Sequence, residues 1–293
     1  MTESQFLAER FEQNRDHLRA VAYRMLGSLP EADDAVQEAW LRLSRSEADA
    51  IDNLGGWLTT VVARVCLDML RARSSRREDE LEDQLSPSSA QRHSTPNPEQ
   101  EALLADSVGL ALMVVLDRLA PAERLAFVLH DMFDLSFDEI ASIIGRSSVA
   151  ARQLASRARK RVRGGAAPPP VVSEQRRIVD AFLAALRAGD FSALVSVLDP
   201  NLVVHTDTAA ATPTLPTEVR GAEFWAGHAI KTAQGARAAR AVLVNGAVGL
   251  VIAPRGRLFR VLTFRFAEGK IAEINIIGNQ TQLTKLDLVL LGG

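Results

Sequence analysis

The sequence predicts a multidomain chain in which two all-α domains are followed by one α+β domain. Apolar residues recur at helical spacing up to about residue 163. A Gly/Pro-rich stretch then interrupts the pattern, and short apolar runs bounded by turn residues follow it, which is typical of strands. With 293 residues, 47% of them hydrophobic, the chain is long enough to form two or three such domains.

The first domain is expected to comprise residues 1–77 and to be a bundle of helices. Apolar residues lie three and four positions apart from Phe6 to Leu26 and, after Pro30, from Ala32 to Leu43. A further apolar helix is expected from Leu54 to Leu70. It ends in a group of arginines, which are Arg71, Arg73, Arg76 and Arg77.

The composition of the remaining chain predicts two connecting segments and two further domains. Residues 78–100 are polar and are expected to form a flexible linker, and helices resume over 101–163. Residues 164–173 are expected to be a stiff Gly/Pro-rich spacer, followed by an α+β domain over 174–293. Its expected strands are 202–206, 239–244, 248–252, 258–266 and 271–277, with hairpin turns at Asn245-Gly246 and Glu268-Gly269.

The segment 136–163 has the pattern of a helix-turn-helix. Ser136 and Glu139 have capping-box spacing, Gly145 ends the first helix, and Ser147 can cap the second. The second helix combines small apolar residues on one side with cations and amides on the other, which suits phosphates and base edges. The alternative is a solvated amphipathic helix in a bundle. The candidate DNA-binding residues here are Ser148, Val149, Arg152, Gln153, Ser156, Arg157, Arg159 and Lys160.

Bulk properties narrow the function further. The net charge of −2 means that any DNA binding must come from local basic surface. The lone cysteine, Cys66, excludes an internal disulfide and a cysteine-rich zinc site, and no metal or cofactor is expected. The N-terminus lacks the apolar stretch of a signal peptide, and no run approaches membrane-spanning length. We therefore expect a cytoplasmic protein with no membrane partner.

Two further segments, 31–42 and 56–71, resemble regions 2.2 to 2.4 of bacterial extracytoplasmic-function (ECF) sigma factors, and the helix-turn-helix then resembles their region 4. The resemblance covers residues 10–163. It implies a non-enzymatic factor that binds core RNA polymerase and promoter DNA, both double-stranded and melted, and directs transcription initiation. Regions 2 and 4 would then be the two all-α domains.

The resemblance also implies roles for residues in region 2. The acidic segment would bind the polymerase, although a solvated helix face is the simpler interpretation of any single carboxylate. Its contact residues would be Asp34, Gln37, Glu38 and Leu41. The second segment would hold the melted minus-ten strand, which needs cations along its backbone and a site for an unstacked base. The simpler interpretation of Trp57 is that it is a core residue. Its contact residues would be Trp57, Thr60, Arg64, Arg71, Arg73, Arg76 and Arg77.

The C-terminal domain resembles the SnoaL-like cone-shaped barrel that is fused to one branch of these sigma factors, most clearly at 188–194 and 198–203. The resemblance implies a built-in regulator that docks on the sigma domains of the same chain. The alternative is a DNA-anchored, ligand-responsive or enzymatic barrel, although Asp207 before a loop is also a common turn cap. The candidate barrel-pocket residues are His205, Asp207, Trp225 and His228, with no catalytic residue assigned.

Overall fold

The structure, a computed structural model, describes residues 3–46, 51–82, 107–163, 170–211, 216–254 and 258–291. Its contacts divide the chain into two compact units. The helical unit contains the described residues of Met1–Leu104 and Asp117–Arg159, and the sheet unit those of Ala105–Leu116 and Lys160–Gly293.

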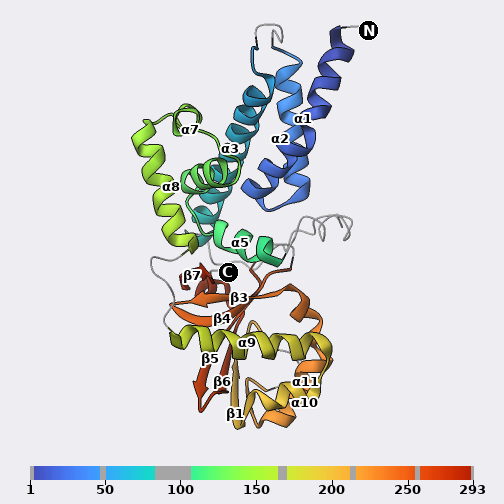
Figure 1. Cartoon of the computed structure of the whole chain (residues 1–293), viewed down its shortest axis with the longest axis vertical. Helices are drawn as coiled ribbons and strands as arrows, with labels where there is room; N and C mark the ends of the chain where they lie inside the picture. Colours follow the sequence, from blue (N-terminus) through green and yellow to red (C-terminus); the bar gives the residue numbers. More distant parts are fainter. Residues whose placement is uncertain are drawn as a thin grey trace. The chain divides into compact units, whose positions relative to one another are not determined.

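The helical unit begins with three helices that contact one another, as Figure 1 shows in blue. They are α1 (Glu3–Leu26), α2 (Leu29–Leu43) and α3 (Leu54–Glu82). Leu18, Val21 and Met25 of α1 are fully buried, as their helical spacing predicts. The later helices of the unit are α6 (Pro121–Phe127), the π-helix η2 (Val128–Met132), α7 (Phe137–Ile144) and α8 (Ser148–Arg163), of which the residues up to Arg159 belong to this unit.

The sheet unit is built on a seven-stranded sheet within the described residues, in the order β2-β1-β6-β5-β4-β3-β7. Strands β1 and β6 pair in parallel, and all other pairs are antiparallel. The predicted hairpin turns are confirmed, because Asn245, Gly246, Glu268 and Gly269 all have positive φ. The strands are β1 (Leu198–Thr206), β2 (Glu218–Arg220), β3 (Ala239–Val244), β4 (Ala247–Ile252), β5 (Arg260–Ala267), β6 (Lys270–Ile277) and β7 (Leu288–Leu290).

An aromatic core fills the space between one face of the sheet and its helices. Phe182 is fully buried; its ring stacks on Trp225 with centroids 5.8 Å apart and meets the edge of Phe264 at 5.5 Å. Such ring pairs add to the burial of large apolar area, so this cluster is the main packing centre of the unit. The surrounding helices are α9 (Pro170–Ala188), α10 (Phe191–Ser196), α11 (Ala222–Lys231) and η3 (Ala233–Ala238).

The opposite face of the sheet is also covered. Along β3, Val242 and Val244 alternate with the core residues Ala241 and Leu243, so they point to the other face, and both are buried. Helix α5 (Ser107–Leu116), from a distant part of the sequence, contacts β3 and β7 of this unit. The buried residues of α5 include Leu110, Met113, Val114 and Leu116.

The predicted fold class is confirmed, and the differences are local. Helix α3 continues to Glu82 rather than ending at residue 77, and α9 begins at Pro170, inside the expected spacer. The rest of the expected linker, 83–100, and most of the expected spacer, 164–169, lie outside the described residues. The edge strands β2 and β7 were not predicted, because three residues are too short to show alternation. In the ranges that the structure describes, no helix combines the length and apolar character needed to cross a lipid bilayer.

Candidate nucleic-acid interface

The helix-turn-helix consists of α7 and α8. Ser136 and Glu139 form a complete capping box, and Gly145 ends α7 with a φ of 68°. The Ser147 hydroxyl then accepts a hydrogen bond from the Ala150 N–H at 3.2 Å and caps α8. The hydrogen bonds that Glu139 accepts from the Ser136 side chain and backbone N–H hold the pKa of its carboxyl below the ordinary value. The predicted start, turn and restart of this motif are confirmed.

Helix α8 has two distinct sides. Ala151, Ala155 and Ala158 are fully buried, so small residues let α8 pack closely on its neighbours. Val149 is 61% exposed although it is apolar, and it lies in the first turn of α8. The other exposed residues predicted to contact DNA are Arg152, Gln153, Ser156, Arg157 and Lys160.

The guanidinium of Arg152 lies over an aromatic ring. Its Cζ is 5.2 Å from the ring centroid of Phe137, and the ring of His130 also lies beside Phe137, with ring centroids 4.0 Å apart. The Nδ1 of His130 lies 2.9 Å from the Leu135 carbonyl oxygen, which fixes the orientation of the imidazole. A cation held over a ring loses less conformational freedom on binding, so this stack positions Arg152 at the start of the exposed face.

On α8, the predicted DNA contacts Arg159 and Ser148 have polar partners on the preceding helices. The Nε of Arg159 donates to Asp131 at 2.6 Å, and this carboxylate on η2 is only 11% exposed. The Ser148 hydroxyl donates to the carboxylate of Asp138. Both bonds fasten α8 to the preceding helices. Sequence reasoning missed them because Asp131 and Arg159 are 28 residues apart, and no local pattern connects them.

The predicted polymerase-binding residues share one exposed face of α2. Asp34, Gln37 and Leu41 are exposed, and Leu41 is 39% exposed although it is apolar. Glu38 lies between them and pairs with Arg42 at 2.9 Å. The opposite face is buried through Ala32, Ala35, Val36, Ala39 and Leu43.

The residues predicted to bind the melted strand divide between different faces of α3. Trp57, Thr60, Arg64 and Arg71 recur at helical spacing, so they form one face. The guanidinium of Arg64 donates to the Ser142 carbonyl oxygen of α7 at 3.2 Å. Arg71 is exposed and lies 3.7 Å from Asp68.

The other arginines of α3 are arranged differently. Arg73 lies on the opposite side of the helix, where it donates to Glu31 at 2.6 and 2.7 Å and to the Leu26 carbonyl oxygen at 3.3 Å. Arg76 donates to the Ala72 carbonyl oxygen at 3.2 Å. The side chain of Arg77 lies outside the described residues.

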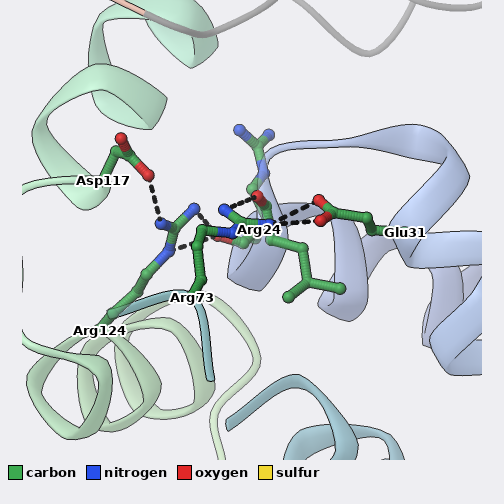
Figure 2. Close-up of polar contacts among 6 residues, drawn as sticks. Arg24, Glu31, Arg73, Asp117 and Arg124 are labelled. Carbon is green, nitrogen blue, oxygen red and sulfur yellow. Dashed lines mark hydrogen bonds and ion pairs between the residues drawn. The ribbon is translucent and has the colours of Figure 1, made fainter. Parts of the chain in front are cut away.

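A buried arginine that the sequence did not predict as functional lies close to Arg73. Figure 2 shows Arg124 of α6, only 2% exposed, donating to the Arg24 carbonyl oxygen at 3.2 and 3.3 Å and facing Asp117 at 3.4 Å. Burial lowers the pKa of Arg124 to about 10, although the charge of Asp117 opposes the shift. The side chain therefore stays cationic at neutral pH. Arg124 lies at the start of the apolar run 125–129, and this is the feature of the sequence from which its burial could have been predicted.

The candidate barrel-pocket residues lie in two places. His205 and Asp207 line a surface cavity of about 530 Å³ together with Glu218, Thr263 and Asn275. Trp225 belongs to the aromatic core on the other face of the sheet, and His228 does not line this cavity. The ring nitrogens of His205 are 3.8 Å from Glu218 and 4.0 Å from Glu273, too far for direct hydrogen bonds.

Asp207 forms a cap between β1 and β6. Its carboxylate accepts hydrogen bonds from the N–H groups of Gly278 at 2.8 Å, Asn279 at 2.7 Å and Ala210 at 2.7 Å. Burial by itself raises the pKa of Asp207, but these backbone donors outweigh it and hold the pKa below the ordinary value of 3.8. This geometry favours a structural role for Asp207 as a cap of the loop, which is the alternative that its position before a loop suggested.

We expect Asp207→Asn to destabilise the chain by about 1 to 3 kcal/mol near neutral pH, because a neutral amide replaces a carboxylate that accepts several backbone bonds. The folded pKa lies below the ordinary 3.8, so the carboxylate stabilises the fold above that pH and loses this effect as the pH falls through the folded pKa. The difference in unfolding free energy between the variant and the wild type should therefore become smaller in acid. Urea unfolding at several pH values measures it, and Asp199→Asn is the control, because Asp199 caps the single N–H of Asn201 on the surface. A pH-independent difference would contradict this account.

Comparison with known proteins supports the resemblance to ECF sigma factors that the sequence motifs indicate. Residues 10–76 match the Sigma-70 region 2 family, and residues 109–162 match Sigma-70, region 4. The ECF RNA polymerase sigma factor SigJ of Mycobacterium tuberculosis is 37% identical over 291 residues, covering 94% of this chain and 92% of SigJ. The probable ECF RNA polymerase sigma factor SigI of M. tuberculosis is 34% identical over 287 residues, covering 96% of each chain. A crystal structure of M. tuberculosis SigJ aligns with a TM-score of 0.44 at 32% identity, over 94% of this chain and 98% of that one.

A helical bundle and a helix-turn-helix with an exposed cationic face, matching sigma regions 2 and 4 in that order, define a transcription initiation factor. The chain belongs to the ECF RNA polymerase sigma factors, since it aligns with SigJ over nearly the whole length of both. It directs promoter-specific initiation, with core RNA polymerase and promoter DNA as its partners.

Proposed function

We propose that the exposed face of α8 recognises the minus-thirty-five element in the major groove. The supporting observation is the exposure of Val149, Arg152 and Gln153 in the first turns of α8, while the small residues behind them are buried. Arginine and glutamine can each make two hydrogen bonds to a base edge, and an aliphatic side chain suits a thymine methyl group. Lys160 and Arg157 then contact phosphates, which requires only charge and reach.

The same reasoning assigns one face of α2 and one face of α3 in region 2. The α2 face with Asp34, Gln37 and Leu41 docks on the polymerase, since it combines negative charge with an exposed aliphatic anchor. The α3 face with Trp57, Thr60 and Arg64 holds the melted minus-ten strand. Arg71 adds charge to that face, whereas the bonds of Arg73 to Glu31 and Leu26 favour a structural role for it.

Replacing Arg152 and Lys160 separately tests the assignment of α8. Arg152→Ala should lower discrimination at one base position by about 1 to 3 kcal/mol, or about 5- to 150-fold. Lys160→Ala should weaken binding to all sequences alike and reduce the slope of log K against log salt by about 0.9. Binding of the full chain to duplex promoter fragments measures both effects. Lys231→Ala, which removes an exposed cation from α11, is the control, and equal effects of Arg152 and Lys160 on every sequence would contradict these roles.

We also propose that the sheet unit is a non-catalytic regulator that docks within the chain. Two observations support this: Asp207 is fully used as a cap, and His205 lacks a partner within hydrogen-bond distance among the carboxylates facing it. Helix α5, part of the region 4 match, shares a unit with the sheet, which supports an attachment between the regulator and region 4. His205→Ala should therefore leave promoter-dependent transcription unchanged, and a loss of output in vitro would favour the enzymatic or ligand-responsive alternative.

A further inference from the structure

The π-helix η2 is linked to α8, the second helix of the helix-turn-helix, through two adjacent residues. The ring of His130 packs beside that of Phe137, and the guanidinium of Arg152 lies over the same Phe137 ring. The carboxylate of Asp131 accepts a hydrogen bond from Arg159 directly, at 2.6 Å. One short turn of the chain therefore supports α8 at two places.

The two supported arginines lie on the same side of α8. Arg152 and Arg159 are seven positions apart, which is about two helical turns and about 10 Å along the helix axis. A helix held at a single place can pivot about it, whereas two supports at this separation fix both the direction of the axis and its rotation. The angle at which α8 presents Arg152 therefore depends on η2.

The backbone of this supporting turn has an uncommon conformation. π-helices are rare and often occur at functional sites, and Asp134, just after η2, has a φ of 56°, which is unfavourable for a residue other than glycine. The Leu135 N–H donates to the Leu129 carbonyl oxygen at 2.9 Å, and the Nδ1 of His130 lies 2.9 Å from the Leu135 carbonyl oxygen. Such a backbone persists only where its surroundings hold it, which points to a positional requirement for the side chains that it carries.

The ion pair of Asp131 and Arg159 is poorly suited to exchange for a contact with DNA. The Asp131 side chain is 11% exposed, and within the described residues its Oδ2 is buried without a hydrogen-bond partner. If Arg159 turned to a phosphate, this carboxylate would lose its cation in a place that water reaches poorly, which is costly. Arg157 and Lys160 are exposed on the same helix and can reach a phosphate without that cost.

We propose that Asp131 is a positioning residue for promoter recognition, and that Arg159 is the internal anchor through which it orients α8, not a contact to DNA. The anchor holds α8 at the angle at which Arg152 reaches its base in the major groove. The proposal rests on the proposed role of α8 as the reader of the minus-thirty-five element. It assigns part of the base specificity to a carboxylate that does not touch the DNA.

Replacing Arg159 and Arg157 separately by methionine tests the proposal. Methionine is a good helix former without charge, so each variant removes one cation from the same helix. Arg159→Met should lower discrimination at the base position that Arg152→Ala identifies by about fivefold or more, the lower end of what one base contact provides. It should leave the slope of log K against log salt unchanged. Arg157→Met, the matched control, should reduce that slope by about 0.9 and keep the discrimination.

Binding of the full chain to duplex promoter fragments with single base changes, at several salt concentrations, measures both quantities. A reduced salt slope for Arg159→Met, or a folded Arg159→Met chain with unchanged discrimination, overturns the proposal. An equal loss of affinity for every sequence would indicate general destabilisation and would overturn it as well. In an Arg152→Ala chain, Arg159→Met should cause no further loss at that base position, and an additional loss there would mean that Arg159 acts independently of Arg152.

Asp131→Asn distinguishes an anchor from a phosphate contact that the carboxylate holds back. The amide keeps the shape of the side chain but accepts more weakly from Arg159. For an anchor, the affinity for the preferred element and the discrimination should both fall at an unchanged salt slope. If Arg159 binds phosphate instead, loss of the competing charge should raise the affinity for all sequences and steepen the slope by about 0.9, which contradicts the proposal.

The measurements separate this proposal from the proposed function. If the wild-type chain shows no base preference, the role of α8 as a reader fails, and the salt slope of Arg159→Met then decides whether Arg159 contacts DNA. If Arg159→Met does not fold, Asp131→Asn decides the matter, since it retains both side chains of the pair at nearly their native size.

Discussion

A chain carrying Asp34→Lys and Leu41→Ala should lose most of its promoter-dependent transcription while remaining folded. Both residues are exposed on α2, and lysine and alanine are good helix formers, so the helix itself should persist. Removing an apolar anchor and reversing a charge at one interface should weaken binding to core RNA polymerase by about 3 to 5 kcal/mol, or about 150- to 5,000-fold.

Polymerase binding by titration and transcript yield from one promoter measure this loss. The matched control combines Asp16→Lys on α1 with Val171→Ala on α9, which makes the same charge change and removes an aliphatic side chain that is 61% exposed. Similar losses in both double variants would show that net charge, and not the α2 surface, is responsible.

The largest stability effect is expected for Phe182→Ala. Phe182 is fully buried and contacts the rings of both Trp225 and Phe264, so its removal leaves a cavity at the centre of the sheet unit. Such truncations cost about 3 to 5 kcal/mol, which corresponds to a fall in Tm of about 6 to 20 °C for a unit of this size.

Thermal unfolding followed by circular dichroism measures the change. Phe191→Ala is the control, because Phe191 is 43% exposed on α10 and its loss should shift the Tm by only about 1 to 2 °C. A small shift for Phe182 would mean that the aromatic core can collapse around the missing ring.

Much of the fold followed from patterns that are local in sequence. The capping box at Ser136, the glycine at 145 and the turns at 245–246 and 268–269 are each set by neighbouring residues, and all are present in the structure. The apolar runs at 239–244 and 248–252 likewise located β3 and β4 to within a residue. Local steric and hydrogen-bonding preferences are enough to define such features.

The features that the sequence did not predict depend on contacts between distant segments. Nothing near Arg124 in the sequence indicates the Arg24 carbonyl, 100 residues away, as its partner. The resemblance grouped Arg73 with Arg71 and Arg76 as contacts of the melted strand, but the helical rotation directs Arg73 to Glu31. The sequence showed which residues were cationic. Only the packing of the helices shows which of these cations already bind carboxylates or carbonyl oxygens of the protein itself.

The position of α5 affects how a shortened chain would behave. Cutting the chain at Pro170 would remove the strands of the sheet, but α5 would remain with its apolar side chains and lose β3 and β7 as neighbours. Newly exposed leucine, methionine and valine side chains favour aggregation. A change in activity after such a cut would therefore combine lost control with damaged folding, and substitutions that leave the sheet in place separate the two effects.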